Sequence, residues 1–204
     1  MKRRMFLKWL AINGLCFAGA FFVVFLLVGL FPDAMLKFLG GWASLIELAG
    51  AKKAAQFSSD FELFLHILIR NSISIGITTI IALLLQSPIL MLAYGAFYSL
   101  IAFLAPLTLG EALPLGGWIT IADESLFLIL CASLASALAT EVFGVKPEWR
   151  DYLGYWKQGW KRLLPPKKDS WRNVLGRHRR ALAFFALIIL VMLLFGAWFE
   201  VWGY

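Results

Sequence analysis

The chain alternates between long apolar runs and short polar breaks, and this pattern predicts helices suited to a membrane. Each run approaches or exceeds the roughly 20 residues that an α-helix needs to cross a bilayer. Proline, glycine and charged residues interrupt the runs, and helices are expected to end there. We therefore predict an all-α fold, a polytopic transmembrane helix bundle with about five spans that forms one membrane domain over residues 1–204. The expected spans are residues 9–31, 61–85, 89–109, 118–143 and 181–202.

The first span follows the basic sequence MKRR, which resembles the start of a signal peptide. Its apolar run is far longer than the core of a signal peptide, which has about 7–15 residues. No Ala-x-Ala cleavage pattern stands directly at its end, where the sequence reads FPDAML. We therefore expect it to be an uncleaved first span.

The segment at about residues 34–50 has apolar residues at helical spacing but is interrupted by a Gly-Gly pair. Met35, Phe38, Trp42 and Ile46 fall on one face of such a helix. A helix of this kind lies in the plane of the membrane interface rather than crossing the bilayer. We predict an interfacial amphipathic helix on the outer side.

Residues 146–165 form a second amphipathic pattern, with aromatic side chains on one face and basic side chains around it. Tryptophan prefers the level of the lipid headgroups, and basic residues are attracted to anionic lipids. We expect the whole stretch 145–180 to bind anionic headgroups, and a docking surface for a cytoplasmic protein partner is the alternative. The residues expected at the lipid surface are Trp149, Trp156, Lys157, Trp160, Lys161 and Arg162.

The composition supports a membrane protein and argues against a nucleic-acid-binding one. The chain is 61% apolar and only 15% charged, with a mean hydropathy of +0.81. A soluble domain is about half apolar and about a quarter charged. The net charge of +7 would suit nucleic acid, but the basic residues gather in the N-terminal tail and in residues 145–180. We therefore expect membrane lipids as partners and no nucleic acid.

The same basic residues predict the orientation. Residues 145–180 hold eleven Lys or Arg against three acids, whereas Glu111 is the only charged residue between the third and fourth spans. The positive-inside rule places the N-terminal tail and residues 145–180 in the cytoplasm. We predict a multi-pass protein of the cell (plasma) membrane, with its N-terminus in the cytoplasm and its C-terminus outside.

A stripe of ionisable residues interrupts the second span. Glu62, His66 and Arg70 follow at four-residue steps, which puts them on nearly one helix face. By helix rise, Arg70 lies at about the depth of Asp123 and Glu124. Because an isolated charge in hydrocarbon costs at least about 2.5 kcal/mol, we expect Arg70 to pair with Asp123 or Glu124. The expected intramembrane polar cluster, in the outer half, comprises Glu62, His66, Arg70, Asn71, Asp123, Glu124 and Glu200.

Two interpretations of this cluster stay open. It is either a buried ion-pair network that fixes helix packing, or a polar cavity for an ion, a proton or a small solute, with His66 and a carboxylate as relays. Ionisable residues inside a membrane favour a function. Residues near the end of a span, however, can reach water and need no function.

Small residues repeat every four positions on two spans, a pattern that lets helix backbones approach closely. Ala132, Ser136 and Thr140 form one stripe, and Gly14 and Ala18 form the other. We expect both stripes to make contacts within the chain. A homo-oligomer or other protein partners are also compatible with such stripes.

No pattern indicates catalysis. Cys16 and Cys131 lie in apolar runs without metal-ligand spacing, so we expect both to be buried small hydrophobes. The chain has no H-E-x-x-H, G-x-S-x-G or G-x-x-x-x-G-K sequence. His178 lies in the basic run RHRR and is expected in solvent. We therefore expect no catalytic residue, no metal site and no cofactor, and a protein that is not an enzyme.

From about residue 61 to residue 203 the chain resembles the stage II sporulation protein M family of integral membrane proteins. The stretches that carry the resemblance are FLHILIRNSISIG, LAYGAFYS, TIADESLFLILCASLASALA and LFGAWFEVW, in this order. The resemblance implies a polytopic membrane protein. In spore-forming organisms the family member works in a complex with cell-wall-degrading partners.

Asn71, Glu124 and Glu200 match the family pattern, whereas Tyr94 and Thr120 stand where the family usually has Asn and His. The resemblance implies a non-enzymatic membrane component or scaffold that organises partners. The alternative is a small transporter or channel. Its polar pocket would be built on Arg70, Asp123, Glu124 and Glu200.

Overall fold

The computed structural model of the chain describes residues 3–40, 57–109, 113–148, 150–151 and 169–203. All the regular secondary structure in these residues is helical, so the predicted all-α class is confirmed. The helices are α1 (Arg3–Leu30), α2 (Pro32–Gly40), α4 (Asp60–Leu83), α5 (Ser87–Leu109), α6 (Leu115–Phe143) and α8 (Trp171–Trp202).

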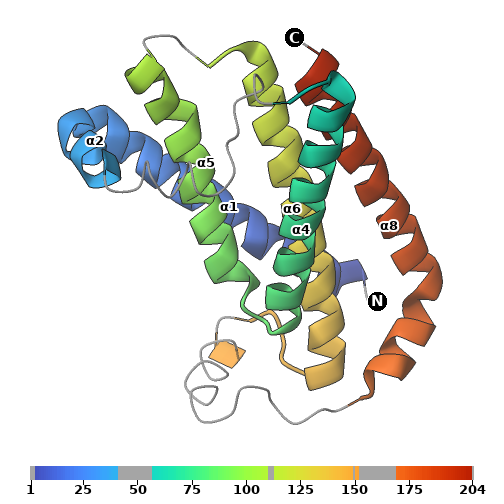
Figure 1. Cartoon of the computed structure of the whole chain (residues 1–204). Coiled ribbons are helices and arrows are strands. Elements are labelled where there is room, and N and C mark those ends of the chain that lie inside the picture. Colours follow the sequence, from blue (N-terminus) through green and yellow to red (C-terminus); the bar gives the residue numbers. More distant parts are fainter. Residues whose placement is uncertain (1–2, 41–56, 110–112, 149, 152–168, 204) are drawn as a thin grey trace.

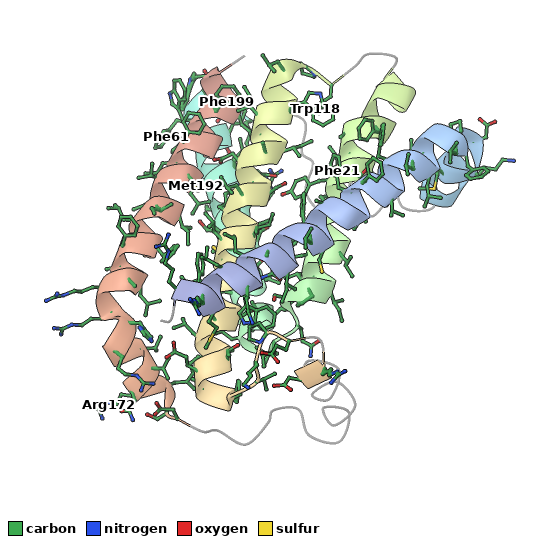
Figure 2. The ribbon with its side chains drawn as sticks, turned by 180° about the vertical axis from the view of Figure 1, so that it is seen from behind. Phe21, Phe61, Trp118, Arg172, Met192 and Phe199 are labelled. Carbon is green, nitrogen blue, oxygen red and sulfur yellow. The ribbon has the colours of Figure 1, made fainter. Side chains whose placement is uncertain are left out.

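Helices α4, α5, α6 and α8 alternate in direction and form an up-and-down bundle, while α1 crosses the bundle obliquely (Figure 1). The view from behind shows α1 lying across the other helices (Figure 2). We call the end at which α8 finishes the Glu200 end, and the end at which α8 begins the Trp171 end. Lys8 Nζ lies 3.9 Å from Glu148 Oε1, just after α6, so α1 starts at the Trp171 end. The start of α1 and the residues that directly follow α6 therefore lie at one end of the bundle.

Four helices, α1, α4, α6 and α8, are long and apolar enough to cross a membrane, judged by length and composition. The expected span at residues 89–109 corresponds to α5, whose apolar part, Ser87–Phe103, falls short of that length among the described residues. The chain is thus a candidate multi-pass membrane protein with four candidate spans. The fifth span stays a prediction.

The boundaries of α8 differ most from the expectation. The helix begins at Trp171 rather than at residue 181. The Ser170 side chain accepts a hydrogen bond from the Asn173 backbone N–H at 3.2 Å, which is a typical N-cap. The apolar run marked only the part of the helix that suits lipid, whereas the cap sets where the helix starts.

Two expected breaks also lie inside helices. Pro88 occupies the first turn of α5, where a missing N–H costs nothing, so it opens this helix rather than interrupting it. Gly116 and Gly117 belong to the first turn of α6, which follows Pro114. The tight turn before α5 includes Leu85, which has a φ of 59° and is fully buried.

Helix α6 is the centre of the bundle. Of its most apolar 18-residue stretch 72% is buried, against 17% or less for α1, α4 and α8. It packs on α1, α4, α5 and α8. The other helices turn large apolar side chains outward, as helices that face lipid do.

The two small-residue stripes differ. Ala132, Ser136 and Thr140 are buried in the bundle, as expected. On α1 the expectation is wrong for the described residues, because Ala18 is exposed and a Cβ added to Gly14 would meet none of them within 4 Å. The close approach of α1 to α5 occurs at Gly95 instead, where an added Cβ would overlap the carbonyl group of Phe17.

The two predicted interfacial helices are only partly described. Helix α2 covers the start of the expected segment 34–50, after a break at Phe31 next to Pro32. The remainder of that segment lies outside the described residues, and so do all six residues expected at the lipid surface: Trp149, Trp156, Lys157, Trp160, Lys161 and Arg162.

Candidate functional site

Arg70 joins three helices near the Glu200 end. Its Nη2 atom on α4 lies 3.3 Å from Oε1 of Glu124 on α6 and 3.8 Å from Oε2 of Glu200 on α8. Of the two partners expected from helix rise, Glu124 is the one that binds Arg70. Glu200 joins the same guanidinium because α8 runs antiparallel to α4 and α6 and brings its last turns to the same end.

Tyr98 on α5 completes the partners of Glu124. Its hydroxyl donates a hydrogen bond to Glu124 Oε2 at 2.7 Å, so both carboxylate oxygens have a partner. The Glu124 side chain is only 10% exposed, and Tyr98 is buried as well. The sequence analysis missed Tyr98. The available signal was a pair of tyrosines, Tyr94 and Tyr98, one turn apart in an otherwise apolar run.

Asp123 does not take part in the ion pair that was expected for it. Its carboxylate lies against α8, where a Cβ added to Gly196 would stand 2.6 Å from Asp123 Oδ2. Gly196 and Glu200 are one turn apart on α8, so Asp123 and Glu200 share the same interface. Within the described part of the chain, Asp123 Oδ2 and Glu200 Oε1 are buried without a hydrogen-bond partner. We call Arg70, Tyr98, Asp123, Glu124 and Glu200 the Arg70 cluster.

The other predicted members lie around this cluster. Asn71 is buried, and its Nδ2 atom has no hydrogen-bond partner among the described residues. The His66 ring packs on Phe57, with ring centroids 5.0 Å apart. Glu62 has a different role from the one expected, because it is exposed and caps α4. Its carboxylate accepts a hydrogen bond from the Ser58 backbone N–H at 2.8 Å.

The charges of the Arg70 cluster do not balance. Glu124 and Glu200 face the Arg70 guanidinium, and Asp123 lies beside them at the α8 interface. Among the described residues of this cluster, the acids outnumber the bases even when His66 is counted as a cation. Buried unpaired charge is costly in protein and in lipid. The cluster therefore becomes neutral only when it takes up protons or a cation. No group of three or more His, Cys, Asp or Glu in the described residues has the geometry to hold a metal ion.

A second group of ionisable residues lies at the Trp171 end. His178 Nε2 is 2.8 Å from Glu141 Oε2, and Arg177 Nη2 lies 2.6 Å from Asp169 Oδ2 and 3.8 Å from Glu141 Oε2. The expectation that His178 points into solvent is wrong, because its side chain is only 14% exposed. Helix α8 starts earlier than predicted, and this brings His178 against the end of α6. We call these four residues the Glu141 cluster.

Asp169 lies just before α8 and helps to start it. Its carboxylate accepts hydrogen bonds from Asn173 Nδ2 at 3.1 Å and from the Ser170 backbone N–H at 2.8 Å. These hydrogen bonds, with the nearby Arg177, hold the pKa of Asp169 below its ordinary value. The carboxylate is thus charged at neutral pH and stabilises the first turn of α8.

The comparisons with known proteins give no relative: no family model, no curated protein and no solved structure matches the chain. The resemblance to the stage II sporulation protein M family therefore stays a prediction from the quoted sequence stretches.

Proposed function

We propose that this chain is a non-enzymatic, multi-pass membrane protein in which the Arg70 cluster binds and releases protons as the core of a small transporter. Four candidate spans support the membrane assignment. With α5 as a fifth span, the positive-inside rule gives a cytoplasmic Trp171 end and an outer Glu200 end in the cell membrane.

The observation that carries the proposal is the excess of carboxylates around Arg70. An ion cluster that only holds helices together is expected to balance its charges and to pair its polar atoms. Within the part of the chain that the structure describes, the Arg70 cluster has more acids than bases, and Asp123 Oδ2 and Glu200 Oε1 have no hydrogen-bond partner. Protons are the simplest ligand that neutralises the surplus. Ionisable residues of this kind in membrane proteins typically mark ion pathways and proton relays.

A scaffold that organises partner proteins is the second candidate. It is favoured by the fact that Arg70 links α4, α6 and α8 through one guanidinium. Such a link fixes the packing of three helices, and this is sufficient for a structural role. In that role the cluster keeps its protons, and the resemblance to the stage II sporulation protein M family implies protein partners instead of a solute.

The two functions are separated by measuring proton flux. The full chain is placed in liposomes that contain a pH-sensitive dye, and a pH difference is imposed across the membrane. We expect the protein to accelerate the decay of this difference, and Glu200→Gln to reduce the rate to that of empty liposomes. Glu62→Gln is the matched control, because Glu62 lies at the same end of the bundle but is exposed and caps α4.

Wild-type liposomes that conduct no better than empty ones would overturn the transporter proposal. The scaffold would then be the better candidate, and copurification of partner proteins from the native membrane would support it. Equal flux for wild-type protein and Glu200→Gln would show that protons cross elsewhere in the bundle.

A further inference from the structure

Hydrogen-bonded pairs of side chains recur along the centre of the bundle from the Glu200 end to the Trp171 end. Each pair joins two different helices, and α6 takes part in four of the five. In order, the pairs are Tyr98–Glu124 at 2.7 Å, Thr78–Tyr94 at 3.2 Å, Ser87–Ser136 at 2.7 Å, Trp9–Thr140 at 2.9 Å and His178–Glu141 at 2.8 Å.

Two tyrosines span the longest step in this series. Along α4, Thr78 lies about 12 Å beyond Arg70 by helix rise. Tyr98 and Tyr94 stand between these levels on α5, with ring centroids 6.4 Å apart. The Tyr98 hydroxyl binds Glu124, whereas the Tyr94 hydroxyl accepts a hydrogen bond from Thr78. The pair therefore carries hydroxyl groups from the Arg70 cluster towards the middle of the bundle.

The remaining steps are shorter. Ser136 Oγ lies 3.4 Å from the carbonyl oxygen of Ala82, which is one turn beyond Thr78 on α4. Thr140 is one turn beyond Ser136 on α6 and donates to its carbonyl oxygen at 2.9 Å. Each of these steps is about 6 Å along a helix, a gap that bridging water molecules can close. Glu141 follows Thr140 directly in the chain.

Further polar atoms in the same bundle point to internal water. Asn13 Oδ1, Asn71 Nδ2 and Ser99 Oγ are buried and have no hydrogen-bond partner in the part of the chain that the structure describes. Buried polar atoms of this kind normally bind internal water molecules. Their presence beside the hydrogen-bonded pairs favours a hydrated interior over a dry one.

We infer that the hydroxyl, carboxyl and imidazole groups of these pairs, with water between them, form a path for protons between the Arg70 cluster and the Glu141–His178 pair. The Trp9 indole N–H only donates to Thr140, so it holds this hydroxyl in place and carries no proton. This inference rests on the proposed function, to which it adds a route and the carboxylate–imidazole pair at its other end. A proton enters at one pair, moves by exchange of hydroxyl and water hydrogen bonds, and leaves at the other, so that no net charge accumulates between them. The competing explanation is that the pairs serve only helix packing, as interhelical hydrogen bonds in membranes commonly do.

The test removes single hydroxyl groups in the middle of the path and measures proton flux in liposomes. Tyr94→Phe and Thr78→Val keep the side-chain shape but delete the hydroxyl. We expect each to lower the flux by about tenfold or more, because proton transfer needs the deleted group. Thr79→Val is the matched control, since Thr79 is the neighbouring residue on α4 and is half-buried. Thr78→Ser keeps the hydroxyl and should retain the flux.

The outcomes separate this inference from the proposed function. If Tyr94→Phe and Thr78→Val conduct protons as fast as the wild-type protein, the path is overturned. The Arg70 cluster would then still be a candidate proton site. Loss of flux in Thr78→Ser as well would show that position 78 acts through packing, which also overturns the path. Wild-type protein without any flux would overturn both proposals.

Discussion

The Arg70 cluster and the Glu141 cluster lie at opposite ends of the bundle and use similar residue types in different ways. In the Glu141 cluster, Glu141 and Asp169 face Arg177 and His178, so the acids and bases of these four described residues are equal in number. Arg177 is 55% exposed there. At the Glu200 end, Glu124 and Glu200 share Arg70 while Asp123 lies beside them against Gly196, and the Glu124 side chain is only 10% exposed. Glu141 and Glu200 are similarly buried, at 16% and 15% exposed, so the two clusters differ mainly in their balance of acids and bases. A charge-balanced cluster clamps two helices at low cost, whereas surplus acid in a buried cluster is costly.

The largest difference between the two ends is expected from removing one acid at each. Glu124→Ala removes the acceptor of the Tyr98 hydroxyl and leaves Arg70 with Glu200 at 3.8 Å as its partner. Breaking a buried pair typically costs about 3–5 kcal/mol. The half-exposed Arg70 places the expected loss at the lower end of this range. Asp169→Ala should lower the unfolding temperature in detergent much less, because water can solvate its partners. Equal losses in both variants would contradict the comparison.

A double-mutant cycle identifies the partner of Arg70. Arg70→Met combined with Glu124→Gln should cost less than the sum of the single substitutions, because neither charge is then left alone. Arg70→Met combined with Asp123→Asn should be closer to additive, since Asp123 lies against Gly196 instead. If the Arg70 substitution is non-additive with Asp123→Asn but additive with Glu124→Gln, then Arg70 pairs with Asp123 and not with Glu124.

Gly176 and Gly196 on α8 lie towards opposite ends of the bundle, and replacing each by alanine tests the two ends through smaller changes in the free energy of unfolding. A Cβ added to Gly176 meets none of the described residues within 4 Å, so Gly176→Ala should stabilise the helix by about 0.5–1 kcal/mol. A Cβ added to Gly196 would stand 2.6 Å from Asp123 Oδ2, so this carboxylate must move. Gly196→Ala should therefore stabilise the protein less than Gly176→Ala does. Unfolding temperatures of both variants in detergent decide the matter, and equal stabilisation would show that Asp123 is free to move away.

The smallest expected effect is a pH dependence at the Trp171 end. The pKa of Asp169 lies below its ordinary value of 3.8 because of its hydrogen bonds to Asn173 and Ser170. A lowered pKa contributes stability that is present above the ordinary pKa and is lost as the pH falls through the lowered one. The difference in unfolding temperature between the wild-type protein and Asp169→Asn should thus be constant near neutral pH and shrink below about pH 4. A difference that grows on acidification would contradict this.

The sequence predicted the features that depend on distance along a helix. Helix rise alone placed Arg70 level with Glu124, and the structure brings their side chains within 3.3 Å. Alternating spans correctly put Glu200 at the same end. The choice between Asp123 and Glu124 was beyond this reasoning, because adjacent residues on a helix point about 100° apart and the rotation of α6 is set by packing.

Features that depend on helix ends and on side-chain direction were the ones missed. His178 was assigned to solvent because the apolar run of α8 starts at residue 181, although the Ser170 cap starts the helix at Trp171. Glu62 was assigned to the cluster by its four-residue spacing, although it lies in the first turn and caps α4. Gly14 and Ala18 have the spacing of a packing stripe, but the oblique path of α1 turns them outward.

Helix α1 forms hydrogen bonds with residues that come much later in the sequence, and this has a consequence for how the chain is synthesised and assembled. Asn13 donates to Ser133 and Trp9 donates to Thr140, at sequence separations of 120 and 131 residues. At a synthesis rate of about 5–20 residues per second, α1 leaves the ribosome roughly 6–26 s before these partners exist. During that interval α4 and α5 are made, and α1 can pack on α5, but the Ser133 hydroxyl that accepts the Asn13 hydrogen bond does not yet exist. Biogenesis of this protein therefore includes a period in which its first helix waits in the membrane, and a factor that shelters Asn13 would speed assembly without touching the finished bundle.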